Sequence, residues 1–446
     1  MSNSSKYLYS PRVIDPLGKI STSLIIQTDK KVSLGGKEYT ITQKLGEGGF
    51  GSVYKCIDNN GKAYAIKKIL TEKTGTPCLF EAAIMNTLQH PSLNKSLMIE
   101  ANLDGLYILQ DVAKYDLSGF IREHFKNGGS IHINQLKNIL YRVGKGISYL
   151  HGKNMIHGDI KAHNVLFFSD TDIRLSDFNL TTMTKWQPTK LHLCTSMYRP
   201  LEIWLNKAWS EKVDIWSYGC LMHELLYGRL LIPYQGDNPD RSINKRKYIN
   251  SLLDWADFNS PGKVNIRKYD VTYLSPNIHT ELLRRKNSSN DREIEDREHD
   301  LYINLMLRCL QILEHSRPSI DTILSDNLYI SIRNKPEYKE LNVKCEQDKF
   351  QINRDFYSII EKEMVGYVDK GNKELLRLSS TICAKYVHIN KYNTHLIKRV
   401  SVWIAKKLLR TNLLSQEIPN LESPAAKEKF LQTELAICNA LEFKLI

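Results

Sequence analysis

Two short stretches decide the fold: HGDIKAHN at residues 157–164 and DFN at residues 177–179. They hold two carboxylates, Asp159 and Asp177, and the amide of Asn164, which lies thirteen residues before Asp177. A lone aspartate is most often a turn former or a helix cap, so neither carboxylate is informative by itself. Their meaning depends on the motifs that precede and follow them.

Upstream, residues 39–70 consist of short β-type runs separated by glycine-rich and turn sequences. The runs YTITQKL, SVYKCI and KAYAIKKIL predict three antiparallel strands, and DNNG at residues 58–61 predicts a turn. Residues 46–53 have the form G-x-G-x-x-G-x-V, in which missing side chains let backbone N–H groups approach phosphate oxygens. A flexible turn is the alternative. A position between two strands suits a phosphate-covering hairpin better than a dinucleotide-binding fold.

Lys67 lies at the end of the third strand, and Glu81 opens the first helical pattern. A lysine and a glutamate so placed form an ion pair that aims the ammonium at the α and β phosphates of a nucleotide. Both residue types are common on surfaces, so only their order relative to the other motifs supports this interpretation.

The remaining hydrophobic spacing predicts helices at residues 80–88 and 135–151, a strand at 106–112, and mostly helical structure beyond residue 214. The sequence therefore predicts a small sheet domain followed by a larger helical one. The motifs described above lie at the junction between the two.

With these motifs in this order, the chain resembles the eukaryotic protein kinase family, whose catalytic loop reads H-R-D-x-K-x-x-N and whose metal motif reads D-F-G. The resemblance covers about residues 39–328 and includes DIWSYG at residues 214–219 and SRP at residues 316–318. It implies an α+β, bilobal fold with a small β-rich N-lobe and a large helical C-lobe. It also implies ATP with Mg²⁺ or Mn²⁺ as cofactors and a protein as the phosphate acceptor.

The resemblance assigns roles to the polar residues of the two motifs. Asp159 is expected to accept the proton of the substrate hydroxyl, with Lys161 beside the transferred phosphoryl and Asn164 and Asp177 as the metal ligands. Phosphoryl transfer needs charge neutralisation and in-line positioning, so one carboxylate for the nucleophile and one for the metal fit this chemistry. The resemblance counts Lys67 and Glu81 as catalytic, and the residues expected to bind ATP are Leu45, Gly46, Glu47, Gly48, Gly49, Phe50, Gly51, Val53, Lys67, Gln110, Val112 and Asp116.

The stretch LQDV at residues 109–112 matches the family's hinge, whose backbone groups bind adenine. The resemblance puts Leu109 at the gatekeeper position and Asp116 where the ribose hydroxyls are often held. Asp214 is expected to anchor the catalytic loop from below. Two further expectations are an ion pair between Glu202 and Arg317 and a stacked apolar column of Met85, His157 and Phe178.

Three departures from the family carry information. Asn179 replaces the glycine of D-F-G, and asparagine is among the few residues that tolerate positive φ. Gly158 replaces the arginine that holds a phosphorylated activation loop in many kinases, and Lys190 falls where cyclin-dependent kinases carry their phosphorylated threonine. Loss of both the phosphate acceptor and its cationic partner predicts an activation loop that needs no phosphorylation.

Lys161 matches the lysine of serine/threonine kinases. The stretch TSMYRPLE at residues 195–202 is similar to the motif T-x-W-Y-R-A-P-E of the cyclin-dependent group. In that group the equivalent of Arg199 shapes a pocket that favours proline after the acceptor. Met197 and the order of residues 200–201 depart from the pattern, so proline direction is left open.

Residues 343–446 form a separate block with helical patterns at 356–367, 374–386, 395–409 and 427–441. Residues 401–407 and 434–445 resemble parts of the cyclin box, with Lys407 and Glu434 matching the residues by which cyclins contact kinases. The block is expected to be an all-α domain with one cyclin-like repeat that acts on the kinase in cis. A plain helical domain is an equal alternative.

The chain has 446 residues, and 62 Lys+Arg against 49 Asp+Glu give a net charge of +13. The basic residues are scattered, so a nucleic-acid surface is not expected, and the eight cysteines lack zinc or disulfide spacing. Residues 1–36 are expected to be a flexible segment without a signal peptide, and no apolar window is long enough for a membrane span. The prediction is a soluble intracellular protein, cytoplasmic, nuclear or both, and the Asn, Lys, Ile and Tyr content favours an AT-rich source such as a large DNA virus.

The sequence thus predicts a kinase domain at residues 37–330 that phosphorylates serine or threonine, with a cyclin or the cyclin-like block as partner. A pseudokinase acting as a scaffold is the main alternative, with Asn179 and Gly158 as signs of decay. A basic nucleic-acid-associated factor is the third hypothesis and depends on net charge alone.

Overall fold

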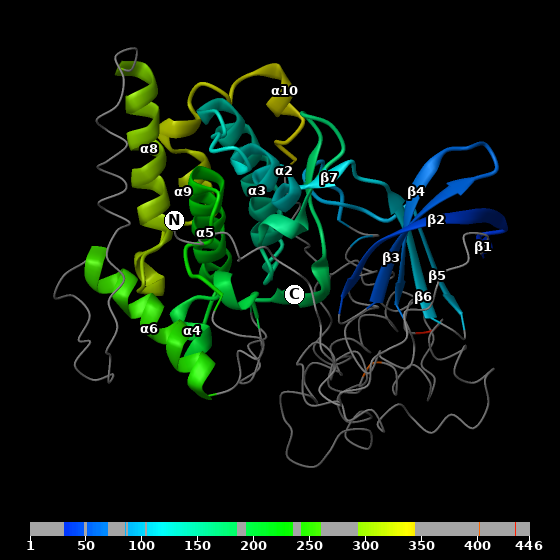
Figure 1. The fold of residues 1–446 in the computed structure, drawn as a ribbon, viewed down its shortest axis with the longest axis horizontal. Coiled ribbons are helices and arrows are strands. Elements are labelled where there is room, and N and C mark those ends of the chain that lie inside the picture. The colour runs from blue at the N-terminus through cyan, green and yellow to red at the C-terminus, as the bar shows by residue number, and fades with distance from the viewer. Residues whose placement is uncertain are drawn as a thin grey trace, which may run out of the picture.

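The computed structural model describes residues 31–48, 51–69, 85, 88–102, 105–184, 193–234, 242–259, 293–343, 401 and 433. These residues form an antiparallel sheet and a larger helical body that lie beside each other (Figure 1). The expected pairing of a β-rich N-lobe with a helical C-lobe is confirmed for this part of the chain.

The N-lobe sheet has the strand order β1-β2-β3-β4-β6-β5, with every neighbouring pair antiparallel. The strands predicted within residues 39–70 are confirmed as the consecutive hairpins of β2, β3 and β4. The strand bounds are β1 Lys31–Leu34, β2 Lys37–Gly48, β3 Gly51–Asp58, β4 Ala63–Ile69, β5 Met98–Asn102 and β6 Gly105–Asp111.

Strand β1 differs from the expectation that residues 1–36 are a flexible segment. It pairs with β2 through a two-residue loop, Gly35 and Gly36, in which both φ angles are positive (56° and 73°). Such a loop is the tight hairpin turn that matches the twist of the strands, and glycine adopts it without strain. Leu34 is buried on the sheet, so the folded unit already includes residue 31.

The two faces of the sheet have different surroundings. Leu34, Tyr39, Cys56, Ile66, Tyr107 and Leu109 form a separate apolar cluster. Ile108, by contrast, belongs to the large core that continues into the helical body. Because side chains alternate along a strand, one face of β6 looks outward and the other looks toward the C-lobe.

The helical C-lobe surrounds helix α5, whose residues from Val213 to Leu226 are all buried. Tyr218 on α5 donates a hydrogen bond to the Leu140 carbonyl at 3.0 Å, which joins α5 to α3. Gly219 allows α8 to approach, since a Cβ there would lie 2.8 Å from Leu310. The helix bounds are α2 Leu117–Phe125, α3 Ile133–Gly152, α4 Leu201–Trp204, α5 Lys212–Tyr227, α6 Ser242–Asn259, α8 Glu293–Cys309, α9 Ile320–Leu324 and α10 Pro336–Lys339.

The C-lobe extends past the expected boundary at residue 330. Tyr338 and Leu341 are buried, and the Leu341 carbonyl is 3.2 Å from Nε2 of His90. The proposed all-α domain at residues 343–446 lies outside the described residues, apart from Val343 at its start and two single helical residues, Ser401 and Thr433. In the described part of the chain, no helix has the length and apolar character of a membrane span.

Candidate active site

A short hairpin explains why two motifs thirteen residues apart in the sequence meet in space. Strands β9 (Val165–Phe167) and β10 (Ile173–Leu175) pair antiparallel, with Val165 opposite Leu175. The residues flanking this hairpin therefore lie side by side, and Ser176 donates its N–H to the Asn164 carbonyl at 2.8 Å. The catalytic loop (residues 157–164) and the DFN stretch thus face the same site.

Asp159 is the centre of a hydrogen-bond network within the catalytic loop and beyond it. Its Oδ2 accepts from Lys161 Nζ at 2.6 Å and from Asn164 Nδ2 at 3.1 Å. Its Oδ1 accepts from the hydroxyl of Thr195 at 2.7 Å and from the Thr195 N–H at 3.0 Å. The structure thus brings the predicted residues Asp159, Lys161 and Asn164 together. The contact of Thr195 with Asp159 was not predicted.

The N-lobe reaches this network through Lys67 on β4, whose Nζ lies 3.1 Å from Oδ1 of Asp177. Burial alone raises the pKa of Asp177, but the ammonium groups of Lys67 and Lys161 outweigh it, and the net pKa is below its ordinary value. Asp177 is therefore an anion at neutral pH. Residues 110 positions apart in the sequence converge here, as predicted.

The DFN stretch corrects one expectation about backbone geometry. The sequence predicts positive φ at Asn179, but within the DFN stretch it occurs at Asp177 (φ 65°) and not at Asn179. A non-glycine residue in this region is strained and is typical of functional sites. Asn179 instead donates Nδ2 to Oδ1 of Asp177 at 2.6 Å, so its side chain helps to orient that carboxylate.

Asp214 on α5 anchors the catalytic loop from below, as expected. Its carboxylate is fully buried and accepts the backbone N–H groups of His157 and Gly158, each at 2.9 Å. It also contacts Nε2 of His151 at 2.9 Å. Burial lowers the pKa of His157, and nearby carboxylates only partly offset this effect. His157 is therefore neutral at neutral pH, and its ring nitrogens contact the Ser176 carbonyl at 3.1 Å and the Asp159 N–H at 3.2 Å.

The expected ion pair of Glu202 with Arg317 is present, and the expected apolar column is shown in part. Arg317 binds both carboxylate oxygens of Glu202, at 2.6 and 3.0 Å, and the pair is buried. His157 and Phe178 have ring centroids 5.3 Å apart, and Met85 is buried in the same core cluster as Phe178.

Gly158 is in the left-handed region (φ 75°), and the space beside it is filled. A Cβ there would lie 2.6 Å from Leu193 Cδ2 and 2.7 Å from the Leu180 carbonyl. The Gly158 carbonyl in turn accepts the N–H of Cys194 at 2.7 Å. The segment leading to Thr195 is therefore held on the catalytic loop by backbone and apolar contacts; Lys190 lies outside the described residues.

The register of β4 and β6 shows which side chains of β6 share a face with Lys67. Ala65 pairs with Gln110, Ile66 with Leu109, and Lys67 with Ile108, and residues opposite each other share a face. Gln110 is therefore on the face of Lys67, whereas Leu109 packs in the outer cluster. The gatekeeper expectation for Leu109 is wrong by one residue, because a one-residue shift along a strand changes the face.

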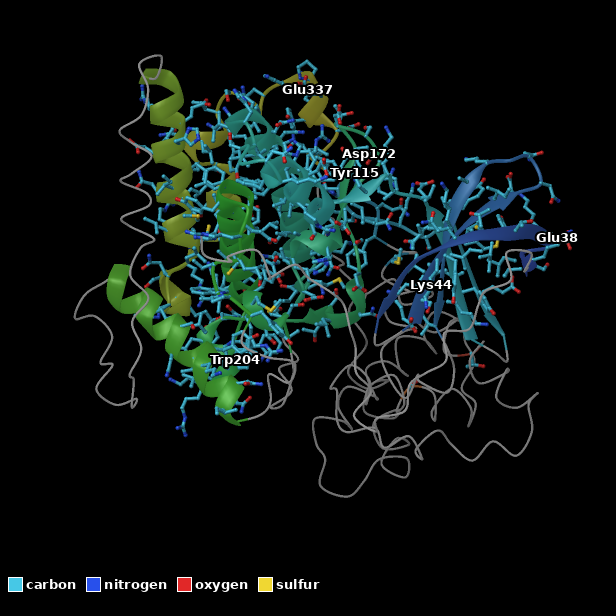
Figure 2. All side chains as sticks on the ribbon, in the orientation of Figure 1. Glu38, Lys44, Tyr115, Asp172, Trp204 and Glu337 are labelled. Carbon is cyan, nitrogen blue, oxygen red and sulfur yellow. The ribbon has the colours of Figure 1, made fainter. Side chains whose placement is uncertain are left out.

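The hinge follows directly after Gln110. In the described part of the chain, no hydrogen bond uses the backbone of Val112 or Ala113, so these groups suit the edge of a base. Arg174 ties the hinge to β10, since it donates to Asp111 at 2.9 Å and to Asp172 at 2.6 Å. Tyr115 and Asp172 mark this junction in Figure 2.

The structure also places several of the other predicted ATP-binding residues. Gly46, Glu47 and Gly48 pair across the hairpin with Val53, Ser52 and Gly51. Gly51 requires glycine, since a Cβ there would lie 2.3 Å from the Lys68 carbonyl. Leu45 is exposed on β2, and Asp116 caps α2 by accepting the N–H of Gly119 at 2.7 Å. Gly49, Phe50 and Glu81 lie outside the described residues, so the Lys67–Glu81 pair stays a prediction.

Comparison with known proteins agrees with this geometry. Residues 39–329 match the family model "Protein kinase domain". The chain is 31% identical over 229 residues to "Cell division control protein 2 homolog 3" of Trypanosoma brucei brucei, covering 49% of this chain and 72% of that protein. It is 29% identical over 258 residues to "Probable CTD kinase subunit alpha homolog" of Encephalitozoon cuniculi (53% and 76%) and 26% identical over 342 residues to "Cyclin-dependent kinase E-1" of Arabidopsis thaliana (69% and 71%).

The matched family model spans more than half of the chain, and the sheet, helical body and polar site have the arrangement that the motifs predicted. The chain belongs to the protein kinase family. Its relatives are distant and of the cyclin-dependent type, and it is a protein serine/threonine kinase. The matches give no evidence for a cyclin box.

Proposed function

We propose that the enzyme transfers the γ-phosphate of ATP to a serine or threonine hydroxyl, with Asp159, Lys161, Lys67, Asn164 and Asp177 as its working residues. The observation that carries the proposal is the convergence of Lys67 on Asp177 at 3.1 Å beside the network of Asp159. One wall of the site comes from the N-lobe and the other from the C-lobe.

The polar residues fit a magnesium ion. Nδ2 of Asn164 donates to the backbone and side chain of Asp159, at 2.8 and 3.1 Å, so the side-chain oxygen of Asn164 is turned away from Asp159. Asp177 is held anionic by the two lysines. Together they offer the oxygen ligands that Mg²⁺ prefers alongside phosphate oxygens. Bound there, the ion would neutralise part of the triphosphate charge.

The residues of the chain perform the remaining steps. Lys67 holds the phosphates that stay on the nucleotide, and Lys161 neutralises charge on the transferred group. The acceptor hydroxyl gives its proton to Asp159 as its oxygen bonds to the γ-phosphorus, and the bond from that phosphorus to the bridging oxygen breaks. Thr195 and Asn164 keep the Asp159 carboxylate in place during this exchange.

We also propose that the acceptor is followed by proline. Cys194 has a positive φ (61°), and its carbonyl accepts two hydrogen bonds from Arg199, at 3.1 and 2.9 Å. Arg199 is held over the ring of Trp204, which is labelled in Figure 2. Cys194 immediately precedes Thr195, which contacts Asp159, so this occupied carbonyl lies next to the acceptor. A residue whose N–H needs a partner is disfavoured there, and proline has no N–H.

Peptide pairs test proline direction. A serine peptide with proline after the acceptor should be phosphorylated with a kcat/KM about tenfold higher than the same peptide with alanine. Arg199→Ala should reduce this ratio by freeing the Cys194 carbonyl. An equal rate for both peptides with the wild-type enzyme would refute proline direction without affecting the kinase assignment.

The cis role of residues 343–446 also stays a proposal, supported by the similarity of residues 401–407 and 434–445 to parts of the cyclin box. Charge reversal of Lys407 or Glu434 in the full chain should lower the rate of phosphoryl transfer severalfold. Rates equal to wild type in both variants would argue against regulation in cis.

A radiolabelled ATP assay on a generic basic protein tests the reaction itself. Wild type should transfer label in the presence of Mg²⁺, whereas Asp159→Asn and Asp177→Ala should each lose it by at least about 10²-fold. If the wild-type protein is folded but transfers no label, the scaffold alternative is favoured instead.

A further inference from the structure

The carboxylate of Asp177 uses only one of its two oxygens for contacts within the described part of the chain. Oδ1 accepts from Lys67 Nζ at 3.1 Å and from Asn179 Nδ2 at 2.6 Å. Among the residues that the structure describes, no hydrogen bond reaches Oδ2. An ionised carboxylate oxygen has two lone-pair positions, so Oδ1 is full and Oδ2 is the oxygen that can bind a cation.

The local backbone holds Asn179 against Asp177. A 3₁₀ turn, Phe178–Leu180, begins directly after Asp177, whose φ is 65°. Asn179 is 4% exposed, so its amide cannot exchange the carboxylate for bulk water without movement of the turn. Beside an anionic oxygen only the NH₂ group of an amide is attractive, and such a hydrogen bond is charge-assisted. Asn179 is therefore a strong and well-placed donor to Oδ1.

The other carboxylate of the site is already engaged by donors. Oδ2 of Asp159 accepts from Lys161 at 2.6 Å and from Asn164 at 3.1 Å. Its Oδ1 accepts from the hydroxyl and the N–H of Thr195, at 2.7 and 3.0 Å. A cation at Asp159 would also be repelled by the Lys161 ammonium. The described part of the site therefore offers a cation two side-chain oxygens, Oδ2 of Asp177 and the amide oxygen of Asn164.

Two such oxygens match one magnesium ion. Mg²⁺ in nucleotide sites is bound by one or two carboxylates together with phosphate oxygens and water. Protein kinases commonly hold two Mg²⁺ ions between the aspartate of D-F-G and the asparagine of the catalytic loop. Two ions about 3.5–4 Å apart are best bound when each takes its own oxygen of the shared carboxylate. In this chain the second oxygen is occupied by Asn179, which replaces the glycine of D-F-G.

We propose that Asn179 is a positioning residue that limits the enzyme to one tightly bound metal ion per nucleotide. This inference depends on the proposed ATP-dependent function. A second ion has to displace the Asn179 amide from Oδ1 of Asp177, and the displaced amide loses a charge-assisted hydrogen bond at a buried place. The affinity for a second ion is therefore at least about tenfold weaker than it would be without this amide.

The number of metal ions bound tests the proposal without relying on turnover. The full-length protein is saturated with adenylyl imidodiphosphate, an ATP analogue that is not cleaved, and titrated with Mn²⁺. Electron paramagnetic resonance measures the free ion. Wild type should bind one Mn²⁺ tightly per nucleotide. Asn179→Ala should bind a second one at least about tenfold more tightly than wild type does, because Oδ1 of Asp177 is released.

The spectrum of the bound ions gives a second readout that a merely structural role of Asn179 would not change. Two Mn²⁺ ions about 3.5–4 Å apart broaden each other's signal through their magnetic coupling. At the same Mn²⁺ concentration, Asn179→Ala should show this broadening and wild type should not. Asn179→Gly removes the same donor and should behave like Asn179→Ala.

Thr182→Val is the matched control. Thr182 is buried three residues along the chain from Asn179, and its hydroxyl has no hydrogen-bond partner among the described residues. The substitution removes a buried polar atom without touching Asp177, so it should leave the number of bound Mn²⁺ ions at the wild-type value. A second tight ion in this variant would mean that loosening of the segment, and not loss of the Asn179 amide, admits it.

The outcomes separate this inference from the proposed function. If wild type binds two Mn²⁺ ions with the same affinities as Asn179→Ala, the limit set by Asn179 is refuted and the kinase function stands. If wild type does not bind the nucleotide at all, the proposed function has failed instead. Melting temperatures identify any variant that does not fold, and the other Asn179 variant then decides. Two tightly bound ions in wild type refute the proposal without any variant.

Discussion

The two walls of the active site are held in different ways. The catalytic loop is fixed by buried groups: Asp214 is fully buried and accepts two backbone N–H groups of the loop. On the N-lobe side, Lys67 reaches Asp177 through a charge contact, and the Asp177 side chain is 35% exposed. The C-lobe wall is thus set by buried contacts, whereas the N-lobe wall meets it through a partly exposed charge contact.

This difference predicts that substitutions beneath the C-lobe wall lower stability and that substitutions in the N-lobe wall lower activity. The largest expected effect is Arg317→Met, which leaves the buried Glu202 carboxylate without its bidentate partner. Removal of one member of a buried pair costs about 3–5 kcal/mol of unfolding free energy. Chemical denaturation of wild type and Arg317→Met measures this loss of unfolding free energy.

Arg308→Met is the control for this prediction. Arg308 pairs with Asp326, but its side chain is 47% exposed, so the loss should be no more than about 1 kcal/mol. Equal losses in the two variants would contradict the claim that burial makes the Glu202–Arg317 pair structural.

The next largest effect is Lys67→Met, which should lower kcat/KM for ATP about 10²- to 10³-fold with little change in melting temperature. The adjacent Lys68 is the matched control, because it lies on the outer face with its ammonium over the Tyr107 ring at 5.0 Å. Lys68→Met should keep nearly full activity. A similar loss from both substitutions would mean that the face assignment of β4 is incorrect.

A smaller, pH-dependent effect is expected at Glu224 on α5. Burial raises its pKa to about 7, despite a hydrogen bond from the Tyr198 hydroxyl. Because the folded pKa is above the unfolded one, this group's contribution to stability is fully present below the ordinary carboxyl pKa. It is lost as the pH rises through about 7.

Glu224→Gln should remove that pH dependence and should be more stable than wild type at pH 8 by about 1–3 kcal/mol. Its amide oxygen can still accept the Tyr198 hydroxyl. Unfolding free energies at pH 5 and pH 8 measure the effect, and a wild-type stability that is flat between them would contradict it.

The smallest expected effect concerns phosphorylation. The segment around Thr195 is held on the catalytic loop, because Cys194 donates its N–H to the Gly158 carbonyl and the Thr195 hydroxyl donates to Asp159. Leu193 already fills the space beside Gly158. Phosphatase-treated enzyme should therefore keep its activity within about twofold. A large gain on phosphorylation at Thr189 or Thr195 would overturn this account of the segment, and an added phosphate on Thr195 should inhibit, since it would face Asp159.

The sequence predicted the parts of the site that depend on order and spacing along the chain. Asp159, Asn164 and Asp177 come together through one short hairpin, and Asp214 and the Glu202–Arg317 pair occupy the expected places. Motifs of this kind are recognised by residue type at fixed offsets, so a single sequence contains the needed information.

The parts that were missed depend on which way a side chain points. The gatekeeper was placed at Leu109 rather than Gln110, since a one-residue shift along a strand reverses its face. Contacts such as Thr195 with Asp159 and Asn94 with Gln110 join segments that have no shared pattern in the sequence. The hairpin of β1 was hidden because two adjacent glycines also fit a flexible segment.

The most direct test of the central claim separates nucleotide binding from proton transfer. Binding of Mg²⁺ and ATP is measured by calorimetry for wild type, Asp159→Asn and Asp177→Ala, together with turnover. We predict that Asp159→Asn binds within about twofold of wild type but loses turnover by about 10²- to 10⁴-fold, whereas Asp177→Ala loses the Mg²⁺-dependent part of ATP binding. Turnover at the wild-type rate in either variant would contradict the convergence of these residues on one triphosphate.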